Sequence, residues 1–176
     1  VVLGASGSGK SSFLRAGLWP RLARDDAAFL PLPVIRPETA VINGSSGLAV
    51  ALAGAFERLG DHRSRGRINQ ALADGVDGFG HLLDDLSQLA KRRLVGTDPT
   101  QADPVIVISI DQAEELFNVE GAAEVAAFVE LLASVLTPSD SALARRILVI
   151  VTIRSDRDEL LQSQAHLAAV KRDLFD

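Results

Sequence analysis

Eight consecutive residues near the start of the chain have the types and spacing of a loop that binds phosphate. Residues 4–11 read G-A-S-G-S-G-K-S, a complete G-x-x-x-x-G-K-[ST] pattern, and the apolar residues 1–3 precede it. Glycines there let backbone N–H groups close around a phosphate, and the positive end of a following helix faces the same anion. Lys10 then supplies an ammonium for catalysis at the β- and γ-phosphates, and Ser11 supplies a hydroxyl for Mg²⁺. The pattern predicts a nucleoside triphosphate site whose phosphate-binding residues are Gly4, Ala5, Ser6, Gly7, Ser8, Gly9, Lys10, Ser11 and Ser12.

An aspartate follows the first of two continuous apolar runs in the second half of the chain. The run covers Val105–Ile110, and Asp111 comes directly after it. In parallel α/β sheets, ligands bind beyond the carboxyl ends of the strands, so a polar side chain at this point lies near the nucleotide. The sequence predicts that Asp111 is the Walker B acid and holds Mg²⁺ together with Ser11, directly or through a water ligand.

Two glutamates, Glu114 and Glu115, lie within one turn of Asp111. A carboxylate that faces the γ-phosphate can orient or deprotonate the attacking water. Acidic residues are also favoured in the first turn of any helix, so the alternative is a solvated pair without a chemical role. We predict that at least one of them is the catalytic base, with Glu115 as the first choice and Glu114 as the second.

Arg154 follows the second apolar run, residues 147–153. A cation at this edge of the sheet can contact the γ-phosphate and stabilise charge during transfer. The alternative is a surface ion pair with Asp156 or Asp158. We predict the catalytic role.

The strands that must position these residues are predicted from the same apolar runs. Continuous β-branched runs are typical of central strands in a parallel sheet that helices cover on both faces. Residues 29–36 are also strand-like, but Pro31 and Pro33 cannot donate to a ladder, so we expect this strand at a sheet edge or shortened to its last residues. We therefore expect an α/β fold with three layers and a mostly parallel sheet.

Apolar periodicity predicts helices over residues 13–22, 48–59, about 80–93 and 125–136. Residues 158–175 are a candidate for one more helix. The basic cluster of His62, Arg63, Arg65 and Arg67 has no periodic apolar partners, so we interpret it as a solvated loop, with a binding patch as the alternative.

The composition is that of one globular domain. The chain has 176 residues, of which 47% are hydrophobic and 23% charged, and it contains no Cys, which excludes disulfides and thiolate zinc sites. A net charge of -5 gives no general attraction to nucleic acid or to an anionic membrane surface. No apolar run approaches the ~20 residues of a membrane span. We expect a cytoplasmic protein, and we expect residues 1–176 to be a single P-loop NTPase domain truncated at both ends.

The chain resembles the STAND class of P-loop ATPases, which are signal-transducing relatives of AAA+ proteins, and more narrowly the novel STAND NTPase family. Four blocks carry the resemblance: GASGSGKSSFLRAGLWPRL (4–22), IRP (35–37), IDQAEELF (110–117) and TIRSD (152–156). The chain departs from the family pattern at Glu38, where glycine is common, and at Ala113 and Arg157, where aromatic residues are usual.

The resemblance implies a sheet of order 5-1-4-3-2, of which the fifth strand is missing here. It also implies that Arg154 is the sensor-I arginine and that Glu115 holds the position of the hydrolytic glutamate in related classes. ATP rather than GTP follows from the resemblance and from the absence of an N-K-x-D motif.

The function implied is that of an Mg²⁺-dependent ATPase and signalling switch, which binds ATP and hydrolyses it slowly to ADP. Self-association of the full-length protein and attached effector or sensor domains are the expected partners. One alternative is a scaffold that holds nucleotide without hydrolysis. A less favoured one is a small-molecule kinase in which residues 63–67 form a phosphate lid.

Overall fold

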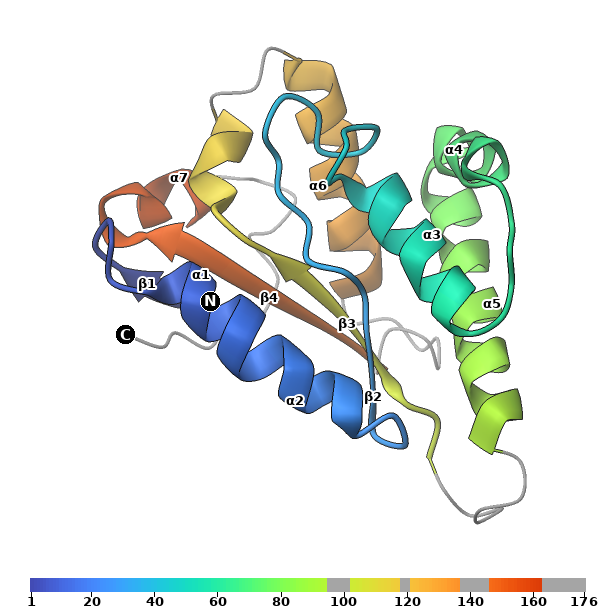
Figure 1. Cartoon of the computed structure of the whole chain (residues 1–176). Helices are drawn as coiled ribbons and strands as arrows, with labels where there is room; N and C mark the ends of the chain where they lie inside the picture. Colours follow the sequence, from blue (N-terminus) through green and yellow to red (C-terminus); the bar gives the residue numbers. More distant parts are fainter. Residues whose placement is uncertain (95–101, 118–120, 137–145, 163–176) are drawn as a thin grey trace.

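The computed structural model describes residues 1–94, 102–117, 121–136 and 146–162 (Figure 1). Its strands form one parallel sheet in the order β1-β4-β3-β2. The strands are β1 (Val2–Gly4), β2 (Phe29–Pro31), β3 (Val105–Ile110) and β4 (Ile147–Arg154). This confirms the predicted α/β class and reproduces the 1-4-3-2 part of the predicted strand order.

The central and edge positions of the strands follow from their residues. In β3, every residue from Ile106 to Ile110 is buried, as expected for a β-branched run with neighbours on both sides. The proline-containing strand β2 lies at the edge of the sheet, which is the first of the two predicted alternatives, and it is not shortened to its last residues. Its first three residues pair with β3, and the N–H of Leu32 donates to the carbonyl of Val107 (2.9 Å). The nitrogen of Pro31, one residue earlier, therefore faces the free edge, where no donor is needed.

Helices cover both faces of the sheet (Figure 1). One continuous helix follows the phosphate loop and crosses the first face; it consists of α1 (Lys10–Ser12), the π-helical segment η1 (Phe13–Leu18) and α2 (Trp19–Arg24). The remaining α-helices of the described residues are α3 (Leu48–Arg58), α4 (Arg65–Ala73), α5 (Gly75–Leu94), α6 (Ala122–Leu136) and α7 (Asp158–Gln162). Two short 3₁₀ segments follow the central strands, η2 (Ala113–Phe117) after β3 and η4 (Ser155–Arg157) after β4.

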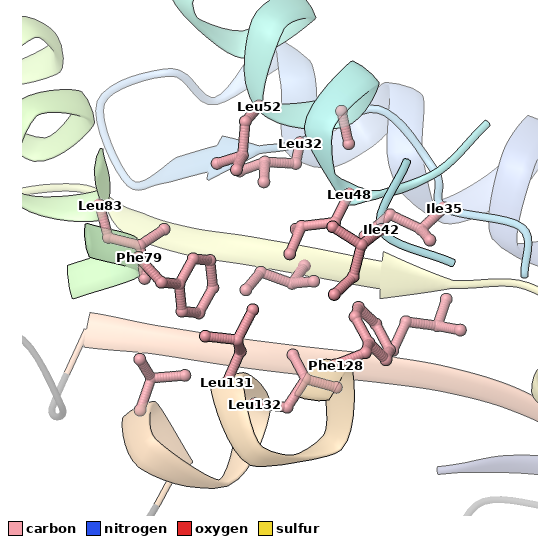
Figure 2. Close-up of a cluster of buried hydrophobic side chains, with 14 of the residues drawn as sticks. Leu32, Ile35, Ile42, Leu48, Leu52, Phe79, Leu83, Phe128, Leu131 and Leu132 are labelled. Carbon is pink, nitrogen blue, oxygen red and sulfur yellow. The ribbon is translucent and has the colours of Figure 1, made fainter. Parts of the chain in front are cut away.

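The main hydrophobic core lies between the sheet and helices α3, α5 and α6. Figure 2 shows Leu52 of α3, Phe79 of α5 and Phe128 of α6 among the side chains that meet beside β3 and β4. Phe79 and Phe128 are fully buried. Burying one such aromatic side chain stabilises the fold by roughly 1.5–3 kcal/mol. This core therefore holds in place the sheet whose strands carry the predicted site residues at their carboxyl ends.

Helix α5 begins at Gly75, five residues before the predicted start, and the glycine at position 78 explains the difference. A Cβ atom at Gly78 would lie 1.9 Å from the carbonyl oxygen of Ala71 in α4. Close packing of the two helices therefore requires a glycine here, although glycine is a poor helix former. Of the predicted tail helix, residues 158–162 are helical, and the remainder up to Phe175 lies outside the described residues.

Candidate functional site

The loop between β1 and α1 has the backbone that its glycines predict. Gly7 and Gly9 have φ angles of 76° and 87°, and a Cβ atom at either would meet no atom within 4 Å. Glycine is therefore required there by the left-handed backbone and not by crowding. Residues 5–9 are exposed, and the helix that begins at Lys10 directs its first N–H groups to the same place. The loop has the shape and exposure for an anion.

Lys10 folds back over this loop. Its Nζ donates to the carbonyl oxygens of Gly4 (2.6 Å) and Ala5 (2.8 Å) and lies 3.5 Å from Oγ of Ser8. The ammonium is thereby held within the ring of backbone that would surround a phosphate, and it can exchange these neutral acceptors for charged phosphate oxygens.

The carboxylate of Asp111 is the centre of the site. It is 1% exposed, and its Oδ1 accepts hydrogen bonds from Oγ of Ser11 (2.8 Å) and from Oγ1 of Thr152 (2.8 Å). Its Oδ2 accepts a hydrogen bond from Nε of Arg15 (3.0 Å). The structure thus brings Ser11 and Asp111 together across 100 residues of sequence, as the motif pattern predicts. The carboxylate is fixed in one orientation by the loop helix and by β4.

Sequence reasoning did not single out Arg15 or Thr152. A signal for each exists in the chain. Arg15 follows Ser11 by four residues, so both side chains leave one face of the helix. Thr152 is the one polar residue within the otherwise apolar run 147–153, and it precedes Arg154 by two residues, which places both on the same face of β4.

The donor set fits a magnesium ion. Mg²⁺ takes hard oxygen ligands, commonly one or two carboxylates together with phosphate oxygens and water. Ser11 and Asp111 offer a hydroxyl and a carboxylate 2.8 Å apart at the mouth of the phosphate loop. Within the described ranges, no group of three or more His, Cys, Asp or Glu residues is arranged to hold a metal. A metal at Ser11 and Asp111 would therefore take its remaining ligands from phosphate oxygens and water.

The two glutamates of η2 contact different neighbours. Glu114 accepts a hydrogen bond at Oε2 from the backbone N–H of Arg154 (3.3 Å), at the end of β4. Glu115 accepts one at Oε2 from the backbone N–H of Glu38 (3.2 Å), in the segment that follows β2. Because β4 lies next to the phosphate-loop strand and β2 lies at the opposite edge, Glu114 is directed toward the loop and Glu115 away from it.

The segment after β2 is anchored to the segment after β3. Arg36 donates to Oε1 of Gln112 and lies 3.9 Å from Oε1 of Glu115. Glu38 has a φ of 40°, an uncommon value for a residue with a Cβ atom. This conformation gives a physical reason for the glycine that the family pattern commonly has at this position.

Arg154 ends β4 with its guanidinium in an ion pair. Its Nε and a terminal nitrogen donate to the two carboxylate oxygens of Asp156 at 3.0 and 2.8 Å. These hydrogen bonds, together with the charge of Asp156, raise the pKa of Arg154 above its ordinary value. The structure therefore contains the ion pair that was the alternative to a phosphate contact, and the Arg154 backbone is what touches Glu114.

The basic cluster at residues 62–67 lies away from this site, and within it Arg63 is partly buried while His62, Arg65 and Arg67 are exposed. Arg63 donates to Asp61 (2.6 Å) and Asp85 (2.9 Å) and lies 3.7 Å from the centre of the Phe56 ring. Hydrogen bonding from Arg63 is the largest cause that lowers the pKa of Asp61. Helix α4, which begins at Arg65, lies at the far side of the molecule from α1 (Figure 1). The interpretation of this cluster as a solvated loop is therefore wrong for Arg63, which is held in ion pairs, while Arg65 and Arg67 are solvated as expected but lie in a helix.

In the described part of the chain, no helix has the length and apolar character needed to cross a membrane. A comparison with curated proteins finds no match. The sequence profile of the family called novel STAND NTPase 1 matches residues 1–175, a span that includes every residue of the site described above. The chain belongs to the novel STAND NTPase 1 family.

Proposed function

We propose that this chain binds ATP with Mg²⁺ and hydrolyses it slowly, as the nucleotide switch of a signalling protein. The family supports a nucleotide-hydrolysing module in general terms. The observation that carries the proposal is the 2.8 Å hydrogen bond from Ser11 to the buried Asp111, since it joins the phosphate loop to the acid that directly follows the central strand β3. Such a hydroxyl and carboxylate are what a P-loop NTPase needs beside its phosphates.

Binding is assigned to the loop, to Lys10 and Ser11 directly after it, and to Asp111. The N–H groups of residues 5–9 and the ammonium of Lys10 would contact the β- and γ-phosphates, while Ser11 and Asp111 would hold the metal. Mg²⁺, when bound, supplies positive charge that offsets the charge on the transferring phosphoryl group. Lys10 contributes to both binding and catalysis, because its charge acts on oxygens that bear charge in the transition state.

Activation of the attacking water is assigned to the η2 glutamates, and the contacts support Glu114 as the stronger candidate. Its carboxylate lies beside the end of β4, next to the phosphate-loop strand. Glu115, which the motif pattern favours, is engaged at the other side with the backbone of Glu38 and remains the second candidate. A base must reach the attacking water, so position decides between these chemically equal groups.

Arg154 is proposed to read the γ-phosphate by exchanging partners. Its guanidinium already binds a carboxylate through two parallel hydrogen bonds, and a phosphate presents the same geometry. The ion pair with Asp156 would then be the resting arrangement, and γ-phosphate would draw the side chain from Asp156 to the nucleotide. In the full-length protein this exchange would couple nucleotide state to conformation, to self-association and to attached effector or sensor domains.

A scaffold that holds nucleotide without hydrolysis is the second candidate. Both η2 glutamates accept hydrogen bonds from backbone N–H groups, as purely structural carboxylates would. The kinase alternative loses its support, because Arg63, the supposed lid residue, is committed to Asp61 and Asp85 beside α4.

Equilibrium binding and single-turnover hydrolysis of ATP test the proposal. We expect the chain to bind ATP in Mg²⁺, Lys10→Ala to abolish binding while the circular dichroism spectrum stays unchanged, and Asp111→Asn to abolish hydrolysis. Arg21→Gln is the control, because Arg21 is exposed on the same helix. Binding without any turnover would favour the scaffold, and absence of binding would refute the nucleotide site.

A further inference from the structure

We propose that Arg15 is the built-in counter-charge of the metal carboxylate, so that it sets how strongly nucleotide affinity depends on Mg²⁺. This inference rests on the proposed nucleotide site. Arg15 is not part of the phosphate-loop pattern, and no role in binding or catalysis follows for it from the motif. The argument is carried by its contact with Asp111.

Asp111 requires a compensating charge because it is buried. The residue is 1% exposed, and buried carboxylates in proteins are paired with a cation or coordinate a metal. The ion pair with Nε of Arg15 at 3.0 Å supplies that charge, while the Arg15 side chain itself is 45% exposed. The carboxylate is therefore immobile and its cationic partner can leave toward solvent.

The two oxygens of Asp111 have different kinds of partner. Oδ1 is held by two neutral hydroxyls, those of Ser11 and Thr152, whereas Oδ2 is held by the charged guanidinium of Arg15. The Ser11 hydroxyl proton already points to Asp111, so its oxygen lone pairs remain available to a metal. A metal on Ser11 and Asp111 would then stand within a few ångströms of the guanidinium. Two cations at that separation repel, so Arg15 and Mg²⁺ oppose one another at this carboxylate.

The helix framework keeps Arg15 at this position. Arg15 lies within the π-helical segment η1, where the N–H of Trp19 bonds to the carbonyl of Leu14 five residues earlier. The indole N–H of Trp19 donates to the carbonyl of Leu32 (2.7 Å) and so fixes the far side of that wide turn to the strand segment beside it. Wide turns of this kind are frequent at functional sites.

Removal of the Arg15 charge has opposite consequences with and without metal. Without Mg²⁺, Asp111 in Arg15→Gln is an uncompensated negative charge that repels the phosphates of the nucleotide. With Mg²⁺ bound, the metal compensates Asp111 and no longer meets a cation, so affinity is retained or improved. We expect the ratio of ATP affinities with and without Mg²⁺ to rise by about tenfold, the effect of one charge-assisted hydrogen bond.

The experiment is a calorimetric titration of the chain with a non-hydrolysable ATP analogue, once in Mg²⁺ and once in EDTA. A second readout needs no nucleotide: Mg²⁺ alone should raise the melting temperature of Arg15→Gln more than that of the wild type. Arg15→Lys keeps the charge and should keep the wild-type ratio. Arg21→Gln, which removes an exposed charge from the same helix, should also leave the ratio unchanged.

The proposal is overturned if the ratio of analogue affinities in Mg²⁺ and in EDTA falls in Arg15→Gln or stays the same, which includes an equal loss of affinity in both conditions. If Arg15→Gln does not fold, the double variant Arg15→Gln/Asp111→Asn, which removes both charges, should fold, and its failure to do so would also overturn it. A wild-type chain that binds no analogue in either condition contradicts the proposed function itself. Wild-type binding combined with an unaltered ratio contradicts the role of Arg15 alone.

Discussion

The carboxylates of Glu114 and Glu115, adjacent in the chain, are bound on opposite sides of β3: Glu114 to the N–H of Arg154 at the end of β4, and Glu115 to the N–H of Glu38 after β2. This divergence follows from the 3₁₀ turn that carries them, in which successive side chains point in different directions. It separates two residues that motif spacing alone treats as equivalent.

We predict that Glu114→Gln slows single-turnover ATP hydrolysis by about 10²-fold or more while ATP affinity is retained, because the base is lost and the phosphate contacts remain. Glu115→Gln is the matched comparison, since it makes the same chemical change one residue away, and we expect a smaller effect on turnover. A larger effect of Glu115→Gln would restore the assignment that the motif pattern favours.

The Arg154–Asp156 pair gives a second prediction. Arg154→Ala should weaken ATP binding about ten- to a hundredfold and leave ADP binding nearly unchanged, because the lost charge-assisted hydrogen bond has a γ-oxygen partner in ATP alone. Asp156→Ala should do the reverse and tighten ATP binding, since it frees the guanidinium from its present partner. Titration of both variants with both nucleotides measures the difference, and equal losses for ATP and ADP would assign Arg154 a structural role.

Acid should remove the contribution of the Asp61–Arg63 pair. The folded state lowers the pKa of Asp61, so the pair stabilises the protein above the unfolded-state pKa of about 3.9, and this contribution disappears as pH falls through the lower folded value. Both side chains are partly exposed, so Asp61→Asn should cost only about 0.5–1 kcal/mol at neutral pH. Urea unfolding at several pH values should show the two proteins converging below about pH 4. A difference that persists in acid would exclude the ion pair as its cause.

Two glycines of α5 should respond oppositely to alanine. Gly78→Ala places a Cβ atom against the Ala71 backbone, so it should destabilise the fold by about 1–3 kcal/mol or more through overpacking. A Cβ atom at Gly80 would meet no atom within 4 Å, so Gly80→Ala should stabilise the helix by roughly 0.5–1 kcal/mol. Thermal unfolding of both variants measures the two effects, and a neutral or stabilising effect of Gly78→Ala would contradict the close packing of α4 on α5.

The sequence predicted the elements that are defined by a local pattern. The apolar runs of β3 and β4 identify central strands, and the phosphate-loop motif places Ser11 close to Asp111. The predicted start of α5 is too late because Gly78 lowers the local helix propensity. The glycine is needed at this position because the backbone of α4 lies against it. Tertiary contact overrides propensity in this case.

Which residues belong to the site could be predicted better than which of them contact one another. Arg15 is separated from Asp111 by 96 residues, so their ion pair depends on how the loop helix lies on the sheet and not on any local spacing. Arg154 lies where it was expected, but whether its guanidinium meets Asp156 or a phosphate is a competition between two anions that sequence cannot rank. The same holds for the orientation of Glu114 and Glu115.

Thr152 links Gln112 to Asp111 through two successive hydrogen bonds. Its hydroxyl has a single proton, which it donates to Asp111 (2.8 Å), and its oxygen accepts the backbone N–H of Gln112 (3.1 Å). A shift of β4 along β3 would break both hydrogen bonds together. The orientation of the Asp111 carboxylate therefore depends on the register of these two strands. Arg154 lies two residues further along the same strand, so Thr152 connects the residue proposed to read the γ-phosphate with the carboxylate proposed to hold Mg²⁺.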